Sequence, residues 1–519
     1  MEIKKSAILV GSACIFSLHA CKNYEKTAGN ESQKPNFLII ISDDQSWVHA
    51  GAYGCNYVRT PKFDSLAQKG LLFNNAFCAA PHSTASRGSL LTGMNPWQLE
   101  EGGTHSSNLP FKFKVFPDIL EENGYITGYT GKGWGPGNWK VTGRKRNPAG
   151  EAYNKYRLEN LPAKFLGDTD PAKNFEDFIS GKKKNQPFCF WYGSSEPHVE
   201  YENGIGIKNG IDTSKIIIPA FLPSMPEVKI EIADYLFEIE WFDKQVGRLI
   251  ESLEKHGLDE NTIIVVTSDN GIVSPHAKRS LYEWGTHIPM VISWPEKLNK
   301  GKVVDRLTSF IDIAPTFLEL AGITIPPEMT GKSFAGLFTN EMEMQKKDDP
   351  YFVLTGFERH DHRRFDNLGY PMRAIRTHQY LYIKNYKPDR WPEGDPVVNE
   401  YGKKDKQGAS SWTNKYAYFE PGTKLFEKAF GKRPPEELFD IGIDPECMNN
   451  LINDKTFRHI ADSLYGILQN ELIIQGDPRE LGYGDIFDSN PYYGTMFRHI
   501  GGFKETGEYN PAYHVHPIK

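Results

Sequence analysis

Uninterrupted apolar runs that end in polar residues constrain the fold of this chain more than any other feature. Such runs lie at 36–42, 187–193 and 262–268, and a shorter strand is predicted at 125–130. A strand buried on both faces has a continuous apolar sequence, which is typical of a parallel sheet covered by helices. Ligands of open α/β sheets bind beyond the carboxyl ends of the strands. The chain is therefore predicted to be an α/β protein with its site at these strand ends.

Oxygen-bearing side chains follow two of the predicted strands. Asp43 and Asp44 come directly after the first run, and Asp269 and Asn270 come directly after the last. Carboxylate and amide oxygens are the ligands that Ca²⁺ and Mg²⁺ prefer. Either pair alone is equally typical of a turn or a helix cap. Two such strand ends in one chain favour a site for one divalent cation.

A charged segment at 341–349 predicts a boundary between two domains. Before it, residues 227–256 repeat apolar residues at spacings of three and four, which predicts a long helix with one buried face. After it, two short segments within 372–383 predict strands of a smaller antiparallel sheet. We expect a larger domain at 36–340 and a C-terminal subdomain at 350–519.

A serine and an arginine four residues apart form the next polar element. Residues 73–77 predict a short strand that leads to Ser83 and Arg87. If a helix begins at Ser83, the two side chains lie on one face. The free N–H groups of its first turn would then suit an oxyanion. A serine cap on an ordinary core helix is the alternative for this motif alone.

Three further side chains that carry or transfer protons follow predicted strands. Lys132 lies in a Gly-rich segment after the second strand, His198 follows the third, and Lys278 lies beyond the fourth. A lysine contacts an anion as a point charge, and a histidine changes protonation near neutral pH. Each residue by itself is also typical of a solvated loop.

The motif around Ser83 resembles the signature of the sulfatase family, C/S-x-P/A-S-R followed by two variable residues, two apolar ones and T-G. Ser83, Ala85, Ser86 and Arg87 match it, as do residues 90–93. The paired residues Asp43 and Asp44, and then Lys132, His198, the pair Asp269 and Asn270, and Lys278, occur in the same order as the corresponding motifs of the family. The segments around Lys278 and within the predicted antiparallel sheet look most like the sulfamidase, or heparan N-sulfatase, branch.

The resemblance implies an alkaline-phosphatase-like α/β fold: a large mixed, mainly parallel sheet flanked by helices, with a smaller C-terminal domain built on an antiparallel sheet. It implies that residues 36–340 are the catalytic domain and that the subdomain at 350–519 completes the substrate pocket. It also implies that a maturation enzyme for serine-type sites oxidises Ser83 to formylglycine. In this family a hydroxyl of the hydrated aldehyde attacks sulfur and forms a covalent sulfo-enzyme. The implied ligands of one Ca²⁺ are Asp43, Asp44, Ser83, Asp269 and Asn270.

The implied catalytic residues combine a nucleophile, positive charge and an acid. The cations would hold the sulfuryl oxygens, and His198 would protonate the leaving group. The set comprises Ser83, Arg87, Lys132, His198 and Lys278.

The chain departs from the family pattern at Trp134, which stands where the family has the histidine of G-K-x-H. His105 and His276 are candidates to share the work of that histidine, and both, like Trp134 itself, are candidates to bind the substrate. Arg359 and His360 are candidates to contact the sugar, although a solvated loop explains them equally well. The implied substrate is a sulfated saccharide, with N-sulfoglucosamine of heparan sulfate favoured and an O-sulfated sugar as the alternative.

Two other functions compete with a sulfatase. A phosphatase or phosphodiesterase of the same superfamily shares the fold but needs more metal ligands, enough for two zinc ions. A non-catalytic glycan-binding protein would explain Trp134 but not the presence of Ser83, Arg87, Asp269 and Lys278 together.

The N-terminus predicts export. Residues 1–20 have two lysines and a short apolar run, which is typical of a signal peptide. Cys21 follows a small residue as in a bacterial lipobox, so we expect a lipid anchor on Cys21, a tether at 21–35, and a place in the periplasm or at the outer-membrane surface. Simple cleavage near Ala20 is the alternative.

Charge and cysteine spacing narrow the partners. The net charge of -6 on 519 residues does not suggest nucleic acid as a partner. The cysteines lack a C-x-x-C spacing, which argues against a cysteine-type zinc site. A disulfide fits an exported protein, but the sequence does not pair the cysteines.

Overall fold

The computed structural model describes residues 33–494, apart from 299, 339–348, 362–363, 365–366, 395–417 and 421. The predicted signal peptide, Cys21, most of the tether and most of the linker at 341–349 lie outside the described residues.

The predicted apolar runs form the centre of an eight-stranded sheet in the described part of the chain. Strands β4, β6, β1 and β7 are neighbours and run parallel, whereas β8 is antiparallel to β7 and β2. In sheet order the strands are β5 (Glu151–Ala152), β4 (Ile126–Gly131), β6 (Phe188–Gly193), β1 (Asn36–Ser42), β7 (Thr262–Ser268), β8 (Met290–Ser293), β2 (Leu71–Phe73) and β9 (Lys302–Val304). The large mixed, mainly parallel sheet is confirmed.

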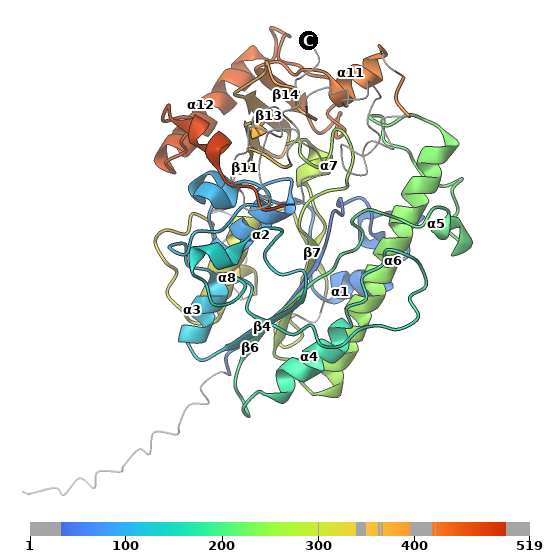
Figure 1. The fold of residues 1–519 in the computed structure, drawn as a ribbon, viewed down its shortest axis with the longest axis vertical. Helices are drawn as coiled ribbons and strands as arrows, with labels where there is room; N and C mark the ends of the chain where they lie inside the picture. The colour runs from blue at the N-terminus through green and yellow to red at the C-terminus, as the bar shows by residue number, and fades with distance from the viewer. Residues whose placement is uncertain are drawn as a thin grey trace, which may run out of the picture. The chain divides into compact units, whose positions relative to one another are not determined.

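Helices cover both faces of this sheet (Figure 1). One face packs against α2 (Ser83–Thr92), α3 (Phe116–Glu122) and α8 (Ile313–Leu320). The other packs against α1 (Pro61–Lys69), α4 (Pro171–Ser180) and α6 (Pro226–Lys255), which confirms the predicted long helix. Strand β1 shows why the run is continuous, because Phe37 and Ile39 enter one apolar cluster while Leu38 and Ile40 enter the other.

The strand predicted at 73–77 is broken in two. Strand β2 ends at Phe73, and β3 (Ala76–Phe77) pairs with β10 (Thr308–Ser309) in a separate sheet. The side-chain amides of Asn74 and Asn75 donate hydrogen bonds to Asp305, at 2.8 and 2.9 Å. These bonds turn the chain away from the large sheet before it reaches α2.

The second sheet is antiparallel, as predicted, in the order β11 (Val353–Phe357), β12 (Met372–Arg376), β13 (Tyr380–Asn385) and β14 (Glu436–Asp440). Helix α12 (Arg458–Ile474) packs its apolar side on one face of it (Figure 1). The other face packs on Leu281 and Tyr282, just beyond Lys278. Here the buried Arg376 Nε of β12 lies 2.5 Å from Glu283 Oε1 of α7 (Glu283–Thr286). The small sheet is therefore fixed to the loop that carries Lys278.

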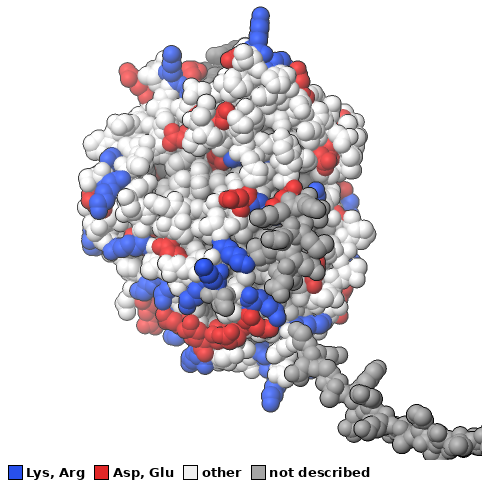
Figure 2. Space-filling view, turned by 180° about the vertical axis from the view of Figure 1, so that it is seen from behind, with Lys and Arg blue, Asp and Glu red and all other residues white. Residues whose placement is uncertain are grey.

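Two shorter helices complete the described set of α-helices, α5 (Ile205–Lys208) and α11 (Lys424–Phe430). Among the described residues, no helix combines the length and apolar character needed to cross a bilayer. The four described cysteines are buried and free, so the disulfide left open by the sequence does not form among them. On the face seen in Figure 2, acidic and basic side chains are intermixed, with an acidic band in its lower part.

Candidate active site

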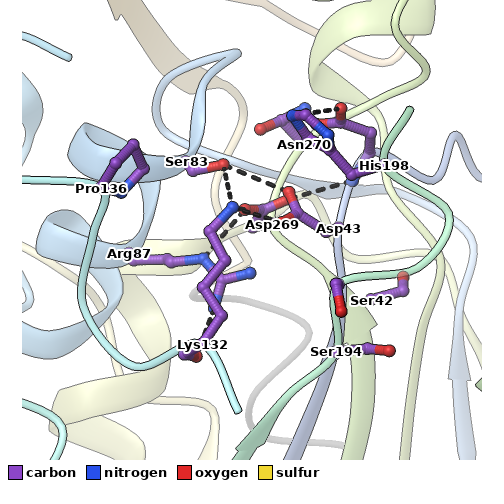
Figure 3. A network of polar contacts seen from close by, with 12 residues as sticks. Ser42, Asp43, Ser83, Arg87, Lys132, Pro136, Ser194, His198, Asp269 and Asn270 are labelled. Atoms are coloured by element: carbon purple, nitrogen blue, oxygen red, sulfur yellow. Dashed lines mark hydrogen bonds and ion pairs between the residues drawn. The ribbon is translucent and has the colours of Figure 1, made fainter. Parts of the chain in front are cut away.

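The carboxyl ends of β1 and β7 bring the predicted cation ligands together. The two strands pair in parallel register up to Ser42 and Ser268, so the residues that follow lie side by side. Oxygens of Asp43, Asp44 and Asp269 lie within 4.8 Å of one another, and all three residues are buried. Figure 3 shows Asp43 and Asp269 facing the same point.

The side chain of Asn270 fits a cation at this point. Its Nδ2 donates to Asp44 Oδ1 at 2.7 Å. Its Oδ1 is buried and has no hydrogen-bond donor among the residues the structure describes. An unpaired buried carbonyl oxygen is costly unless something binds it. Three carboxylates and this oxygen form a donor set that suits a hard divalent cation.

Ser83 is the first residue of α2, as the motif predicted. The preceding residue, His82, is extended and makes no side-chain cap to the helix. Ser83 Oγ lies 3.3 Å from Asp43 Oδ1 and accepts a hydrogen bond from Lys132 Nζ at 2.9 Å. Lys132 also forms an ion pair with Asp43 (Figure 3). The hydroxyl therefore lies between the carboxylate cluster and a lysine.

Arg87 lies one helical turn after Ser83 and is completely buried. Its Nε donates to Asp269 Oδ2 at 2.9 Å, and its Nη1 donates to the carbonyl of Lys132 at 3.0 Å. Its Nη2 has no acceptor within the described part of the chain. Arg87 therefore connects α2, β4 and β7 and keeps one N–H group unused.

Lys278 and His198 approach the cluster at Asp44. Lys278 Nζ donates to both carboxylate oxygens of Asp44, at 2.6 and 2.8 Å. His198 Nε2 lies 3.7 Å from Asp44 Oδ2, and its side chain is 41% exposed. His198 Nδ1 lies 2.6 Å from the carbonyl of Val199, so it carries a proton and Nε2 is the nitrogen that faces the site.

The lysines keep the carboxylates ionised. Burial raises the pKa of Asp43, but the nearby Lys132 helps to outweigh burial and the pKa lies below its ordinary value. Burial likewise raises the pKa of Asp44, and Lys278 is the largest of the opposing influences that bring it below the ordinary value. Both side chains are therefore anionic at neutral pH, the form that binds a cation.

The structure does not bring Trp134, His276 and Arg359 into this cluster. Trp134 is buried in an apolar cluster against α2. His276 donates to the carbonyl of Glu446 at 2.9 Å and stacks on Tyr282. Arg359 is fully buried and donates to the carbonyls of residues 490 and 491, at 2.8 and 2.9 Å. Packing and backbone hydrogen bonds thus hold all three side chains away from the carboxylates.

His105 and His360 do meet, at a second polar cluster beside α2. Their rings stack with centroids 3.9 Å apart. His82 stands at a steep angle to both, and Thr84 Oγ1 contacts His105 Nδ1 at 3.3 Å. Sequence reasoning missed His82 and Thr84, although both flank the motif serine.

Comparison with known proteins agrees with this geometry. The family model described as sulfatase matches residues 35–323, which is more than half of the chain. The chain therefore belongs to the sulfatase family and is a sulfatase. A second model, described as N-sulphoglucosamine sulphohydrolase, C-terminal, matches residues 273–396.

The most similar relatives include several sulfatases. An ulvan-active sulfatase from Formosa agariphila is 26% identical over 507 residues, 92% of this chain and 90% of that protein. The N-sulphoglucosamine sulphohydrolase of Homo sapiens is 26% identical over 444 residues, 79% of this chain and 86% of that protein. A solved structure in complex with its substrate D-glucosamine-2-N,6-O-disulfate has a TM-score of 0.62 at 20% identity, over 86% of this chain and 99% of that chain. That similarity supports the fold.

Proposed function

We propose that this sulfatase removes sulfate from a glycosaminoglycan saccharide, with N-sulfoglucosamine of heparan sulfate as its substrate. The observation that carries the reaction is the position of Ser83 Oγ, within reach of both Asp43 and Lys132. The match of residues 273–396 to the N-sulphoglucosamine sulphohydrolase C-terminal model and the similar human enzyme support the substrate.

Ser83 is proposed to be oxidised to formylglycine by a maturation enzyme for serine-type sites. That group would supply a hydrated aldehyde whose hydroxyl attacks sulfur. Asp43, Asp44, Asp269 and Asn270 would hold one Ca²⁺, which supplies positive charge beside the nucleophile. The buried unpaired Oδ1 of Asn270 and the ionised carboxylates support this assignment.

The protein's own cations prepare the site for a sulfate. Lys132 Nζ lies 2.9 Å from Ser83 Oγ. It would therefore be close to a sulfuryl oxygen of a substrate bound at the nucleophile. Arg87 holds Asp269 with Nε, which leaves its Nη2 group as a further donor. Lys278 forms an ion pair with Asp44 and neutralises the charge of its carboxylate. Fixed donors in a buried site stabilise developing negative charge without having to reorganise.

His198 is the proposed acid for the leaving group. Its half-exposed ring presents Nε2 toward the cluster, 3.7 Å from Asp44 Oδ2. Proton transfer from Nε2 leaves the Nδ1 contact with Val199 intact. The small sheet, fixed on the loop after Lys278, is proposed to complete the saccharide pocket.

Mass spectrometry and one matched pair of variants test the reaction. Co-expression with a serine-type maturation enzyme should lower the mass of the peptide containing Ser83 by two hydrogens. Ser83→Ala should abolish sulfate release while the protein stays folded. Ser89→Ala is the control, because Ser89 is buried on the same helix and its Oγ has no partner in the described structure. Unmodified Ser83 together with an active Ser83→Ala variant would refute the proposal.

A substrate panel decides between the two sugar classes. The O-sulfatase left open by the sequence is the second candidate, and the ulvan-active relative, which aligns over 92% of the chain, supplies the sugar to test. We expect release from N-sulfoglucosamine and from disaccharides that end in it, and slower release from ulvan fragments. The reverse order would assign the protein to the second candidate.

The cell location is proposed from the N-terminal sequence. A lipid on Cys21 would anchor the exported protein at the periplasmic or outer-membrane surface. Metabolic labelling with a radioactive fatty acid should mark the protein and fail to mark Cys21→Ala. Equal labelling of both would refute the anchor.

A further inference from the structure

Three buried histidines next to the nucleophile take no part in the sulfatase reaction proposed above. His82 precedes α2, His105 lies in the loop that follows it, and His360 lies just after β11. His82 is fully buried, and the other two are 7% and 8% exposed. The rings of His105 and His360 stack at 3.9 Å, and His82 lies 5.4 and 5.9 Å from them between centroids.

The hydrogen bonds of Thr84 fix the tautomer of His105. Thr84 Oγ1 donates its one proton to the carbonyl of Pro136 at 2.6 Å and accepts from the backbone N–H of Ser106 at 3.0 Å. The contact with His105 Nδ1 at 3.3 Å therefore requires the proton to be on the ring. His105 Nδ1 is the donor, so Nε2 of the neutral ring carries a lone pair.

Asp361 does the same for His360. His360 Nδ1 lies 2.8 Å from Asp361 Oδ2, which places a proton on Nδ1. His360 Nε2 is buried and has no partner among the described residues. A carboxylate behind one nitrogen and a free lone pair on the other is the arrangement that orients metal-binding histidines.

His82 supplies further unused nitrogens. Both of its ring nitrogens are buried without a hydrogen-bond partner in the described structure. Unpaired buried polar atoms cost free energy, and three of them in one cluster point to a missing ligand. Ligand atoms of His105, His360 and Asp361 already lie within 4.8 Å of one another.

We propose that His82, His105 and His360 form a second metal site that binds Zn²⁺, with Asp361 orienting the ring of His360. Imidazole nitrogens suit zinc and similar transition metals. The oxygen ligands around Asp269 suit Ca²⁺. The two sites therefore select different ions. A ligating imidazole holds the metal in its ring plane, so the nearly parallel rings of His105 and His360 would have to tilt about their Nδ1 contacts to bind one ion.

The neutral state of the rings agrees with this site. Burial lowers the pKa of His360 to about 4 and holds that of His105 well below its ordinary value. Both rings are therefore unprotonated at neutral pH and ready to bind metal without losing a proton. The bound ion would connect the start of α2 with the loop after β11, since His82 and His360 are 278 residues apart in the chain.

Metal titration of the full-length protein tests the site. Chelator-treated protein, with excess Ca²⁺ added to fill the oxygen site, is titrated with ZnCl₂ by calorimetry and with Co²⁺ by visible absorption. We expect one Zn²⁺ per chain, displacement of Co²⁺ by Zn²⁺, and a higher unfolding temperature with Zn²⁺. His105→Ala and His360→Ala should each weaken Zn²⁺ binding by at least ~100-fold, and Thr84→Val by about 10-fold.

Two controls keep the result specific. His256→Ala removes a histidine at the end of α6, whose Nδ1 contacts the carbonyl of Ser252, and should bind Zn²⁺ like the parent protein. Asp269→Asn should impair the calcium site and leave Zn²⁺ binding unchanged. Circular dichroism would test whether each variant is folded. If His105→Ala or His360→Ala does not fold, His82→Ala takes its place in the titration. Absence of stoichiometric Zn²⁺ binding, or unchanged binding in the folded histidine variants, would overturn the proposal. The readout is metal binding, so it is independent of sulfatase activity.

Discussion

Replacing Arg376 by leucine should weaken the attachment of the small sheet to the catalytic part of the chain. Arg376 and Glu283 are both buried, with Nε 2.5 Å from Oε1. His287 Nδ1 contacts the same carboxylate at 3.2 Å. In Arg376→Leu, the Glu283 carboxylate keeps its buried position but loses its main counter-charge.

The pKa of Glu283 sets the size of the effect. Burial raises this pKa, but Arg376 and then His287 overcome burial and lower it from 4.5 to about 2. That difference corresponds to about 3 kcal/mol of stability. This value agrees with the loss of roughly 3–5 kcal/mol of stability that follows when one partner of a buried ion pair is removed. Because the folded pKa is lowered, this stability is present above the unfolded pKa and is lost as the pH falls through about 2.

Urea unfolding followed by tryptophan fluorescence measures the loss. Arg376→Leu should lower the free energy of unfolding by about 3 kcal/mol, and the double variant with Glu283→Gln should recover at least ~1 kcal/mol because no unpaired charge remains. The matched control is Glu251→Gln, which removes an exposed partner 3.3 Å from Lys62 and should cost less than about 0.5 kcal/mol. Equal stability of Arg376→Leu and the parent protein would refute the argument.

Three further predictions concern the site and the pH response. Arg87→Lys should lower kcat at least ~100-fold, because an ammonium group cannot contact Asp269 and the Lys132 carbonyl together; near-parent turnover would contradict this. Removal of divalent cations with a chelator should abolish turnover and lower the unfolding temperature, and Ca²⁺ alone should restore turnover and part of the lost unfolding temperature; full activity without a cation would exclude a role for the ion. Burial lowers the pKa of His49 to about 3, so its contribution to stability is complete above pH ~6.5 and falls by about 1.4 kcal/mol per pH unit as the pH drops toward 4. In His49→Gln, the free energy of unfolding should fall less steeply between pH ~6.5 and ~4, by about 1.4 kcal/mol per pH unit. An unchanged dependence of the unfolding free energy on pH would show that His49 is not responsible.

The meeting of the candidate site residues was predictable because most of them follow a recognisable strand or lie in the first turns of a helix. Continuous apolar runs revealed β1 and β7, and parallel pairing then required Asp43 and Asp269 to meet. The spacing of Ser83 and Arg87 predicted that they share one helix, whereas their selection as site residues depended on the resemblance to the sulfatase motif. These inferences use local patterns and one general rule of sheet topology, so they need no knowledge of side-chain packing.

Other features depend on contacts that no local pattern specifies. His105 and His360 come together only because the loop after β11 lies beside α2, and the sequence gives no indication of that. Arg359 and His360 are neighbours in sequence, yet one binds the carbonyls of residues 490 and 491 while the other joins the histidines. The break between β2 and β3 depends on hydrogen bonds to Asp305, which is distant in sequence.

The position of Trp134 limits how the missing family histidine could be restored by engineering. A Cβ added at Gly88 of α2 would lie 3.5 Å from Trp134 Nε1, and one at Gly137 would lie 2.8 Å from the far edge of the indole. The indole thus fills the space between these two backbones. A Trp134→His exchange would open a cavity behind α2 and bury an imidazole there, without directing it to the substrate. A histidine that reaches the site from this position would therefore require the Gly-rich loop to be rebuilt, because the indole packs this loop against α2.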